Sequence, residues 1–124
     1  MRKAFAPLAI LPTLATTPTS AGSSWIFGDW ARQDGASRVK IRNCGASICV
    51  VNTWIRDPNS GEKVGDQLIL KVSQTADGWT GSAYDPQRKL KMSITLKGDA
   101  SAMTSSGCVL GGLFCKSASW RRAR

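Results

Sequence analysis

Residues 108–115 read CVLGGLFC, two short apolar runs joined by a glycine pair and bracketed by cysteines. Two glycines between β-prone runs favour a two-residue hairpin turn, because glycine readily takes the positive φ that such a turn requires. The resulting register pairs Leu110 with Leu113, Val109 with Phe114, Cys108 with Cys115, and Met103 with Trp120. This stretch therefore predicts an antiparallel hairpin closed by a Cys108–Cys115 disulfide.

The other cysteine pair predicts a second hairpin. If residues 45–48 form a four-residue loop, Cys44 faces Cys49 and a second disulfide closes the turn. This register pairs Val39 with Trp54, Ile41 with Asn52, and Asn43 with Val50. Successive side chains of a strand point to opposite faces, so Arg38, Lys40 and Arg42 fall on the solvent-exposed face.

A third hairpin is indicated by a turn over residues 85–88. It pairs Ala83 with Leu90, Gly81 with Met92, and Trp79 with Ile94, and it leaves Lys89 and Lys91 on the wet face. A slip by one residue would destroy the agreement between apolar and polar faces, so the pattern specifies its register.

The same period-two alternation recurs along the rest of the chain, with clusters of glycine, proline and aspartate between the alternating runs. We predict eight strands, near residues 29–34, 37–43, 49–56, 67–73, 79–84, 88–97, 101–109 and 113–121. Eight short antiparallel strands with neither a repeat nor a linker predict an all-β fold, a single small up-and-down β-barrel.

The first 21 residues are typical of a secretory signal peptide. Arg2 and Lys3 give a basic start, an apolar run comes next, and small residues precede an expected cleavage between Ala21 and Gly22. The mature domain is then residues 22–124, exported to the periplasm or secreted. No second apolar run is long enough to predict a transmembrane segment.

The mature chain is basic and contains four cysteines. It keeps 15 basic residues against 8 acidic ones, a net charge of +7, which favours anionic partners. An oxidising compartment makes two disulfides the expected state of the cysteines. The chain has no histidine, so a Ser/His/Asp triad, a Cys/His pair and imidazole metal ligands are all excluded.

Two motifs lie near the ends of the predicted barrel. Gly28-Asp29-Trp30 opens the first strand, and Trp120-Arg121-Arg122 closes the last. Closure of a barrel brings these strands together, and Arg122, which shares the parity of Trp120, is expected to stack on Trp30 by a cation–π contact. This layout resembles the G-x-W start and the late arginine of lipocalins.

A longer series of motifs resembles one bacterial family, the domain of unknown function 2147, whose members are small exported proteins with a lipocalin-like barrel. The series runs in order through Trp30, Asn43-Cys44-Gly45, Cys49, Trp79-x-Gly81, Tyr84-Asp85-Pro86, Gly107-Cys108 and Trp120-x-Arg122. Val50 and Arg88-Lys89-Leu90 depart from its pattern locally. The resemblance implies a fold and a compartment, and it implies no settled activity.

Neither catalysis nor nucleic-acid binding is expected. The acidic residues stand at turns or strand ends, where they cap turns by local hydrogen bonds: Asp29, Asp34, Asp57, Glu62, Asp66, Asp77, Asp85 and Asp99. We therefore predict no enzyme activity, no cofactor and no metal. Five tryptophans on a basic chain would suit a single-strand platform, but Trp54, Trp79 and Trp120 fall on the apolar face and are interpreted as core.

Two functional hypotheses remain. An eight-stranded barrel is just wide enough to hold one small ligand, so the first is an apolar-ligand-binding barrel of the bacterial envelope. Its expected lining has Asn52 as the one polar group and comprises Val39, Ile41, Asn52, Trp54, Leu68, Leu70, Trp79, Met92, Ile94 and Met103. The alternative is a solid-cored protein that binds a lipopolysaccharide-like polyanion or a protein partner through exposed cations, namely Arg38, Lys40, Arg42, Lys89 and Lys91.

Overall fold

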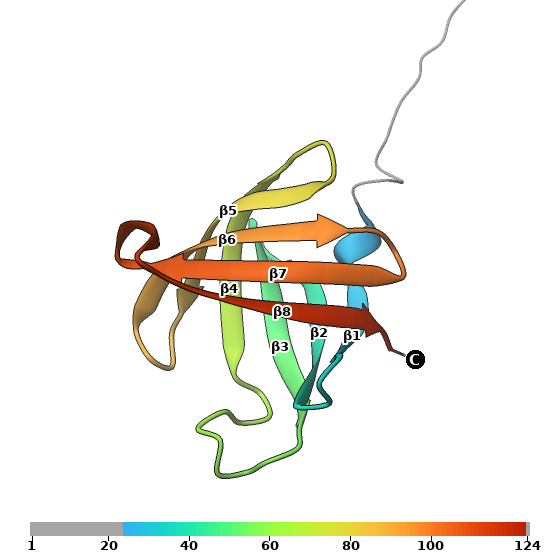
Figure 1. Cartoon of the computed structure of the whole chain (residues 1–124), viewed down its shortest axis with the longest axis vertical. Helices are drawn as coiled ribbons and strands as arrows, with labels where there is room; N and C mark the ends of the chain where they lie inside the picture. The colour runs from blue at the N-terminus through green and yellow to red at the C-terminus, as the bar shows by residue number, and fades with distance from the viewer. Residues whose placement is uncertain (1–23, 124) are drawn as a thin grey trace, which may run out of the picture.

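A computed structural model describes residues 24–123, which form one closed antiparallel barrel (Figure 1). Each strand pairs with the next along the chain, and β8 returns to pair with β1. After a 3-10 turn, η1 (Ser24–Ile26), come β1 (Gly28–Arg32), β2 (Ser37–Cys44), β3 (Ser47–Ile55), β4 (Gln67–Gln74), β5 (Gly78–Asp85), β6 (Leu90–Gly98), β7 (Ala102–Val109), η2 (Leu110–Gly112) and β8 (Phe114–Arg122). The predicted eight-stranded barrel is confirmed, whereas the predicted signal segment, residues 1–21, lies outside the described residues.

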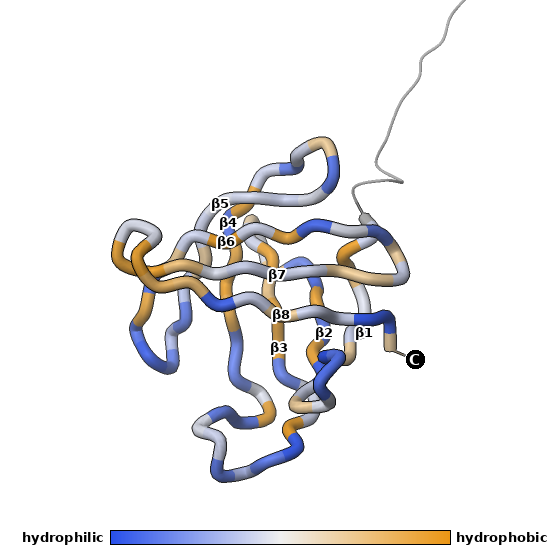
Figure 2. The backbone as a smooth tube through the Cα atoms, viewed as in Figure 1, coloured by the Kyte–Doolittle hydropathy of each residue, from blue (hydrophilic) through white to orange (hydrophobic). Residues whose placement is uncertain are grey.

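Alternation of apolar and polar residues decides which face of each strand turns inward. In β2, Val39 and Ile41 are buried while Arg38 and Lys40 are exposed, and the tube in Figure 2 changes colour along the strands accordingly. The packed centre of the barrel consists of buried apolar side chains from every strand except β3 and β8, together with Ile26 of η1: Ile26, Trp30, Val39, Ile41, Leu70, Ala83, Ile94, Leu96 and Met103.

Because consecutive strands are antiparallel, the connections between them lie alternately at the two ends of the barrel. One end, here the η1 end, carries η1, the β2–β3, β4–β5 and β6–β7 turns, and the C-terminal end of β8. The opposite end, here the distal end, carries the β1–β2 and β3–β4 loops and the β5–β6 and β7–β8 turns. Figure 1 shows the β7–β8 and β5–β6 turns on the left of the view and η1 on the right.

Both predicted disulfides are confirmed, Cys44–Cys49 and Cys108–Cys115. The β7–β8 register is also as predicted, with Cys108 opposite Cys115 and Met103 opposite Trp120. The turn is longer than the predicted two residues, because the strands end at Val109 and Phe114, so Leu110 and Leu113 belong to the turn and are not a strand pair. The β2–β3 register is wrong by two residues, because Cys44 pairs with Ser47 across a turn of two residues. Gly45 has a φ of +71° there, which allows a tighter turn than the expected loop of four residues.

A β-bulge at the start of the same hairpin turns Trp54 outward. Arg38 pairs with Trp54 and Val39 with Asn52, so Thr53 is the extra residue of β3. A one-residue insertion reverses the facing of the residues beyond it. Trp54 is consequently 45% exposed, and its predicted place in the barrel lining is wrong.

The β5–β6 register also differs by two residues from the prediction. Ala83 pairs with Met92, Gly81 with Ile94, and Trp79 with Leu96. The turn has the expected four residues but lies one position later, over residues 86–89, because Asp85 pairs with Leu90 and its carboxylate organises the turn. One carboxylate oxygen accepts from the Gln87 and Arg88 backbone N–H groups at 3.0 and 3.2 Å, and the other binds the Arg88 guanidinium at 2.9 Å. Arg88 also donates to the Gly61 carbonyl at 2.8 Å, which ties the turn to the β3–β4 loop.

Asp85, Gln87 and Arg88, here the Asp85 cluster, make the stability of the fold depend on pH. Burial alone would raise the pKa of this carboxyl, but hydrogen bonds from Arg88 and Gln87 outweigh burial and lower the pKa below 3.8. A group with a lowered folded pKa stabilises the fold above its unfolded pKa, and that contribution is lost as the pH falls through the folded value. We expect the free energy of unfolding to fall more steeply from about pH 4 to pH 2 in the native chain than in Asp85→Asn.

Urea titrations at several pH values measure this difference. Asp77→Asn serves as the control, because Asp77 is an exposed acidic residue in the β4–β5 turn. An equal loss of acid sensitivity in the two variants would contradict the role assigned to the Asp85 cluster.

Candidate ligand site

The η1 end of the barrel is sealed by Trp30 and Arg122. The Arg122 guanidinium carbon lies 4.0 Å from the centroid of the Trp30 ring, and the two residues are paired between β1 and β8. The predicted stacking is thus confirmed. Trp30 is fully buried, and its indole N–H donates to the Ile26 carbonyl at 2.9 Å, which fixes η1 over the end of the barrel.

Arg122 also donates hydrogen bonds to backbone carbonyls of two other segments. It donates to the Phe27 carbonyl at 2.9 Å, to the Trp25 carbonyl, and to the Ala100 carbonyl at 3.0 Å. The guanidinium carries five donors in a planar fork, so one side chain can bridge η1, β1 and the β6–β7 turn. This arrangement holds Phe27 where it enters the barrel.

Gly28 explains why the motif that opens β1 starts with glycine. Its φ is +114°, a conformation that other residues rarely adopt, and a Cβ placed there would lie 2.9 Å from an Arg122 guanidinium nitrogen. The glycine therefore provides both the backbone conformation and the space that the Trp30–Arg122 stack needs.

A pocket of about 690 Å³ opens beside this seal. It lies between the β2–β3 turn and the β4–β5 hairpin, and Phe27 of the η1–β1 junction forms part of its wall. Its residues are mostly apolar or small, and they are Phe27, Asn43, Ala46, Ser47, Ile48, Leu70, Lys71, Val72, Ser73 and Trp79. The interior of the barrel is thus packed at its centre, and the pocket is an open groove at the η1 end.

Trp79 gives this pocket an unusual polar group. Its indole nitrogen is buried and has no hydrogen-bond partner, the one side-chain nitrogen or oxygen of this kind among residues 24–123. A buried tryptophan N–H usually has a partner, because leaving it without one costs ~1–3 kcal/mol. A pocket lining that contains such a donor is suited to a ligand with a hydrogen-bond acceptor.

The comparison with known protein families covers the whole barrel, from the first residue of β1 to the last residue of β8. Residues 28–122 match the family described as "Uncharacterized protein conserved in bacteria (DUF2147)". The chain belongs to the DUF2147 family. The match begins at Gly28 and ends at Arg122, so it spans the whole sealing motif and every pocket residue except Phe27. The chain matches no curated protein and no solved structure.

The residues predicted to line the DUF2147 barrel divide into several groups. Leu70 and Trp79 line the pocket. Leu68 and Met92 are half-buried against the packed centre. Four others, Val39, Ile41, Ile94 and Met103, belong to that packed centre. Val39, Ile41 and Ile94 therefore fill the interior, whereas Met103 also lines a smaller pocket by the β6–β7 turn.

Asn52, the predicted polar group of the lining, is used elsewhere in the DUF2147 barrel. Its side-chain nitrogen donates to Glu62 Oε1 at 3.2 Å and to the Lys63 carbonyl at 3.3 Å. Asn52 thus anchors the β3–β4 loop at the distal end. Trp79 is instead the pocket-lining residue whose buried polar atom has no hydrogen-bond partner.

Three apolar pocket residues were not predicted. Ile48 falls within the four-residue loop expected for the β2–β3 turn, although its register partner Leu70 was predicted correctly. Val72 follows Leu70 at the next inward position of β4, so alternation could have found it. Phe27 precedes the first strand, and no periodic signal marks it.

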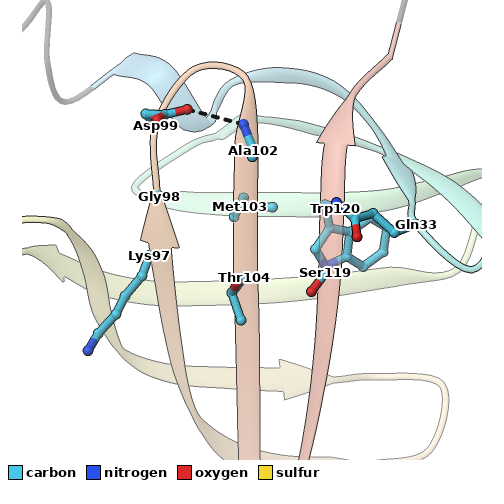
Figure 3. A pocket seen from close by; sticks show the side chains of 9 residues that line it. All are labelled: Gln33, Lys97, Gly98, Asp99, Ala102, Met103, Thr104, Ser119 and Trp120. Carbon is cyan, nitrogen blue, oxygen red and sulfur yellow. Dashed lines mark hydrogen bonds between the residues drawn. The ribbon is translucent and has the colours of Figure 1, made fainter.

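A second pocket of about 300 Å³ lies by the β6–β7 turn and β8 (Figure 3). Two of its polar side chains, Asp99 and Trp120, already have partners. Asp99 accepts from Ser101 and Ala102, and the Trp120 indole N–H donates to Ser105 Oγ at 2.9 Å. Lys97 points away from the other labelled side chains in Figure 3. This pocket therefore offers a ligand less than the Trp79 pocket does.

The five predicted surface cations are all exposed but do not form one patch. Arg38, Lys40 and Arg42 project from β2, whereas Lys89 lies in the β5–β6 turn and Lys91 at the start of β6. In the closed order of eight strands, β2 and β6 are four strands apart in either direction and so stand on opposite walls. The structure thus contradicts a single polyanion site made from all five.

The described part of the chain lacks two further features. Residues 24–123 contain no group of three or more cysteine, aspartate or glutamate side chains that could hold a metal ion. Within the same residues, no helix has the length and apolar character needed to cross a membrane.

Proposed function

We propose that this chain is a non-catalytic envelope protein that binds one small, mainly apolar molecule bearing a hydrogen-bond acceptor. The observation that supports it is the buried, unpartnered Trp79 N–H in the lining of an otherwise largely apolar pocket. An acceptor on the ligand would satisfy this donor, and the apolar body would cover Ile48, Leu70 and Val72.

The dimensions of the pocket support a ligand of this class. Small-molecule sites are mostly apolar hollows of about 300–1,000 Å³ with a few placed polar groups. The volume of about 690 Å³ lies within that range, and Asn43, Ser47 and Ser73 supply additional polar atoms. Lys71 in the lining favours a neutral or anionic ligand over a cationic one.

Two disulfides in a chain of this size support the exported location. Such bonds persist in oxidising compartments, and small secreted domains depend on them. The predicted signal segment would deliver the domain to the periplasm or the medium, where the site would meet molecules of the envelope.

Decanoate and 1-anilinonaphthalene-8-sulfonate are suitable probes, since each joins an apolar body to an acceptor group. Trp79→Phe keeps the ring and removes the donor. We expect it to weaken binding of either probe about five- to tenfold, the loss of one hydrogen bond worth ~1–1.4 kcal/mol. Displacement of the fluorescent sulfonate by decanoate gives both affinities.

Two variants complete the test. Trp120→Phe is the matched control, because it removes an indole N–H that is bonded to Ser105 outside this pocket, and it should leave affinity unchanged. Ala46→Trp adds a large side chain at an exposed position of the lining and should block the probes. Absence of binding to the native chain, or binding unaffected by both Trp79→Phe and Ala46→Trp, would refute the proposal.

A further inference from the structure

The tip of the β7–β8 hairpin exposes three large apolar side chains. Leu110, Leu113 and Phe114 are 72%, 73% and 60% exposed, although Val109 and Phe114 pair as the hairpin register requires. Figure 2 shows this tip as a hydrophobic segment that projects from the distal end of the barrel. Single exposed apolar residues are common, but three together at a projecting turn indicate an interaction site.

The tip is held rigidly in this exposed form. Cys108 and Cys115 are bonded at its base, and the Leu113 backbone N–H donates to the Leu110 carbonyl at 3.3 Å. Leu110 has a φ of +54°, and Lys89 in the neighbouring β5–β6 turn has a φ of +52°. They are the two non-glycine residues with positive φ among residues 24–123, and both stand at the distal end. Such strained conformations persist where the surrounding structure imposes them, often at functional sites.

The cations beside the tip lie on β8, on β6 and in the β5–β6 turn. The acidic residues of the distal end other than Asp85 lie in the β1–β2 and β3–β4 loops, and they are Asp34, Asp57, Glu62 and Asp66. Lys89, Lys91 and Lys116 are exposed at the distal end, and the chain has no acidic residue after Asp99. The acid of the adjacent turn, Asp85, is already paired with Arg88. The tip thus joins apolar side chains to cations that have no acidic neighbour on β7 or β8.

We infer that this tip docks the protein onto an anionic lipid bilayer. Leu110, Leu113 and Phe114 would enter the interface between headgroups and acyl chains, and the three lysines would contact lipid phosphates. Peripheral proteins combine buried apolar area with attraction of basic residues to anionic lipid in this way. A second copy of the chain fits less well, because it would bring the same lysines together.

Docking at the distal end leaves the Trp79 pocket facing away from the bilayer, since that pocket lies at the η1 end. The two sites are independent, and the bilayer inference does not rest on the ligand proposed above. Loss of one activity without the other is therefore an interpretable result.

Cosedimentation with vesicles tests the inference, using phosphatidylglycerol mixed with phosphatidylcholine and, separately, phosphatidylcholine alone. The native chain should bind the anionic vesicles and not the neutral ones. Leu113→Ser with Phe114→Ser should weaken binding at least tenfold, while Val64→Ser, at a residue 64% exposed in the β3–β4 loop, should not change it.

Two triple variants that each remove three positive charges distinguish binding at the tip from attraction by the net charge of the protein. Replacing Lys89, Lys91 and Lys116 by glutamine should weaken binding by about a hundredfold, at about fivefold for each of the three basic residues near the surface. The same change at Arg38, Lys40 and Arg42, on the opposite wall, should have a much smaller effect. Equal losses in the two triple variants would overturn the inference, as would binding that Leu113→Ser with Phe114→Ser leaves intact. A concentration-dependent dimer that this double variant abolishes would assign the tip to self-association instead.

Discussion

Trp30→Ala is expected to lower the free energy of unfolding by ~3–5 kcal/mol, the cost of truncating a large buried aromatic side chain. Trp30 is fully buried, its ring contacts the Arg122 guanidinium, and its N–H holds η1 through the Ile26 carbonyl. Alanine would remove all three interactions and leave a void at the sealed end. Urea unfolding followed by far-ultraviolet circular dichroism measures the loss without relying on tryptophan emission.

Trp54→Ala is the matched control, because it makes the same substitution on the outer face of the barrel, whereas Trp30 lies on the inner face. Trp54 is 45% exposed and lies outward beyond the β3 bulge, so its truncation should cost less than about 1 kcal/mol. Comparable losses in the two variants would contradict the outward placement of Trp54, and a small loss in Trp30→Ala would contradict the sealing role.

The faces of the strands were predictable, whereas two of three hairpin registers were not. Alternation repeats every two residues, so a shift by two leaves every side chain on the same face and cannot be detected from hydrophobicity. Only turn geometry distinguishes the alternatives. The β7–β8 register followed from Gly111-Gly112, although the turn extends over residues 110–113, whereas Gly45 permitted a shorter turn than expected and Asp85 moved its turn by one residue.

The Cys44–Cys49 disulfide was predicted correctly from a wrong register. In the observed pairing Cys49 lies opposite Arg42 and Cys44 opposite Ser47, yet the two cysteines share the outer face and their Cα atoms are 5.8 Å apart. A disulfide spans this separation as readily as that of a directly opposed pair. Cysteine spacing therefore identifies a hairpin and its facing without fixing its register.

The candidate ligand site was only partly predictable. Leu70 and Trp79 followed from alternation, but an extra residue in β3 removed Trp54 from the interior, and a bulge of this kind leaves no mark in the pattern. The free Trp79 N–H depends on what surrounds the ring in three dimensions. Phe27 enters the pocket because Arg122, 95 positions later, binds its carbonyl, and local sequence does not contain that contact.

Arg122→Met should lower the free energy of unfolding by roughly 3 kcal/mol, because three hydrogen bonds from a charged donor and one cation–π contact are lost together. Methionine keeps much of the apolar stem, so the loss measures the guanidinium. Without it the carbonyls of Trp25, Phe27 and Ala100 lose their common donor. Urea unfolding provides the measurement, as for Trp30→Ala.

Arg121→Met is the control, because Arg121 is exposed on the adjacent position of β8 and should change stability by no more than about 0.5 kcal/mol. Arg122→Lys should recover little of the loss. A compact ammonium group lacks the planar fork of donors with which the guanidinium reaches three carbonyls at once. Because Arg122 holds Phe27, and Phe27 lines the Trp79 pocket, Arg122→Met should also weaken probe binding under conditions where the variant is still folded. A variant that loses stability but keeps full probe affinity would separate the seal from the pocket, whereas equal effects of Arg121→Met and Arg122→Met would contradict the assignment of the stacking arginine.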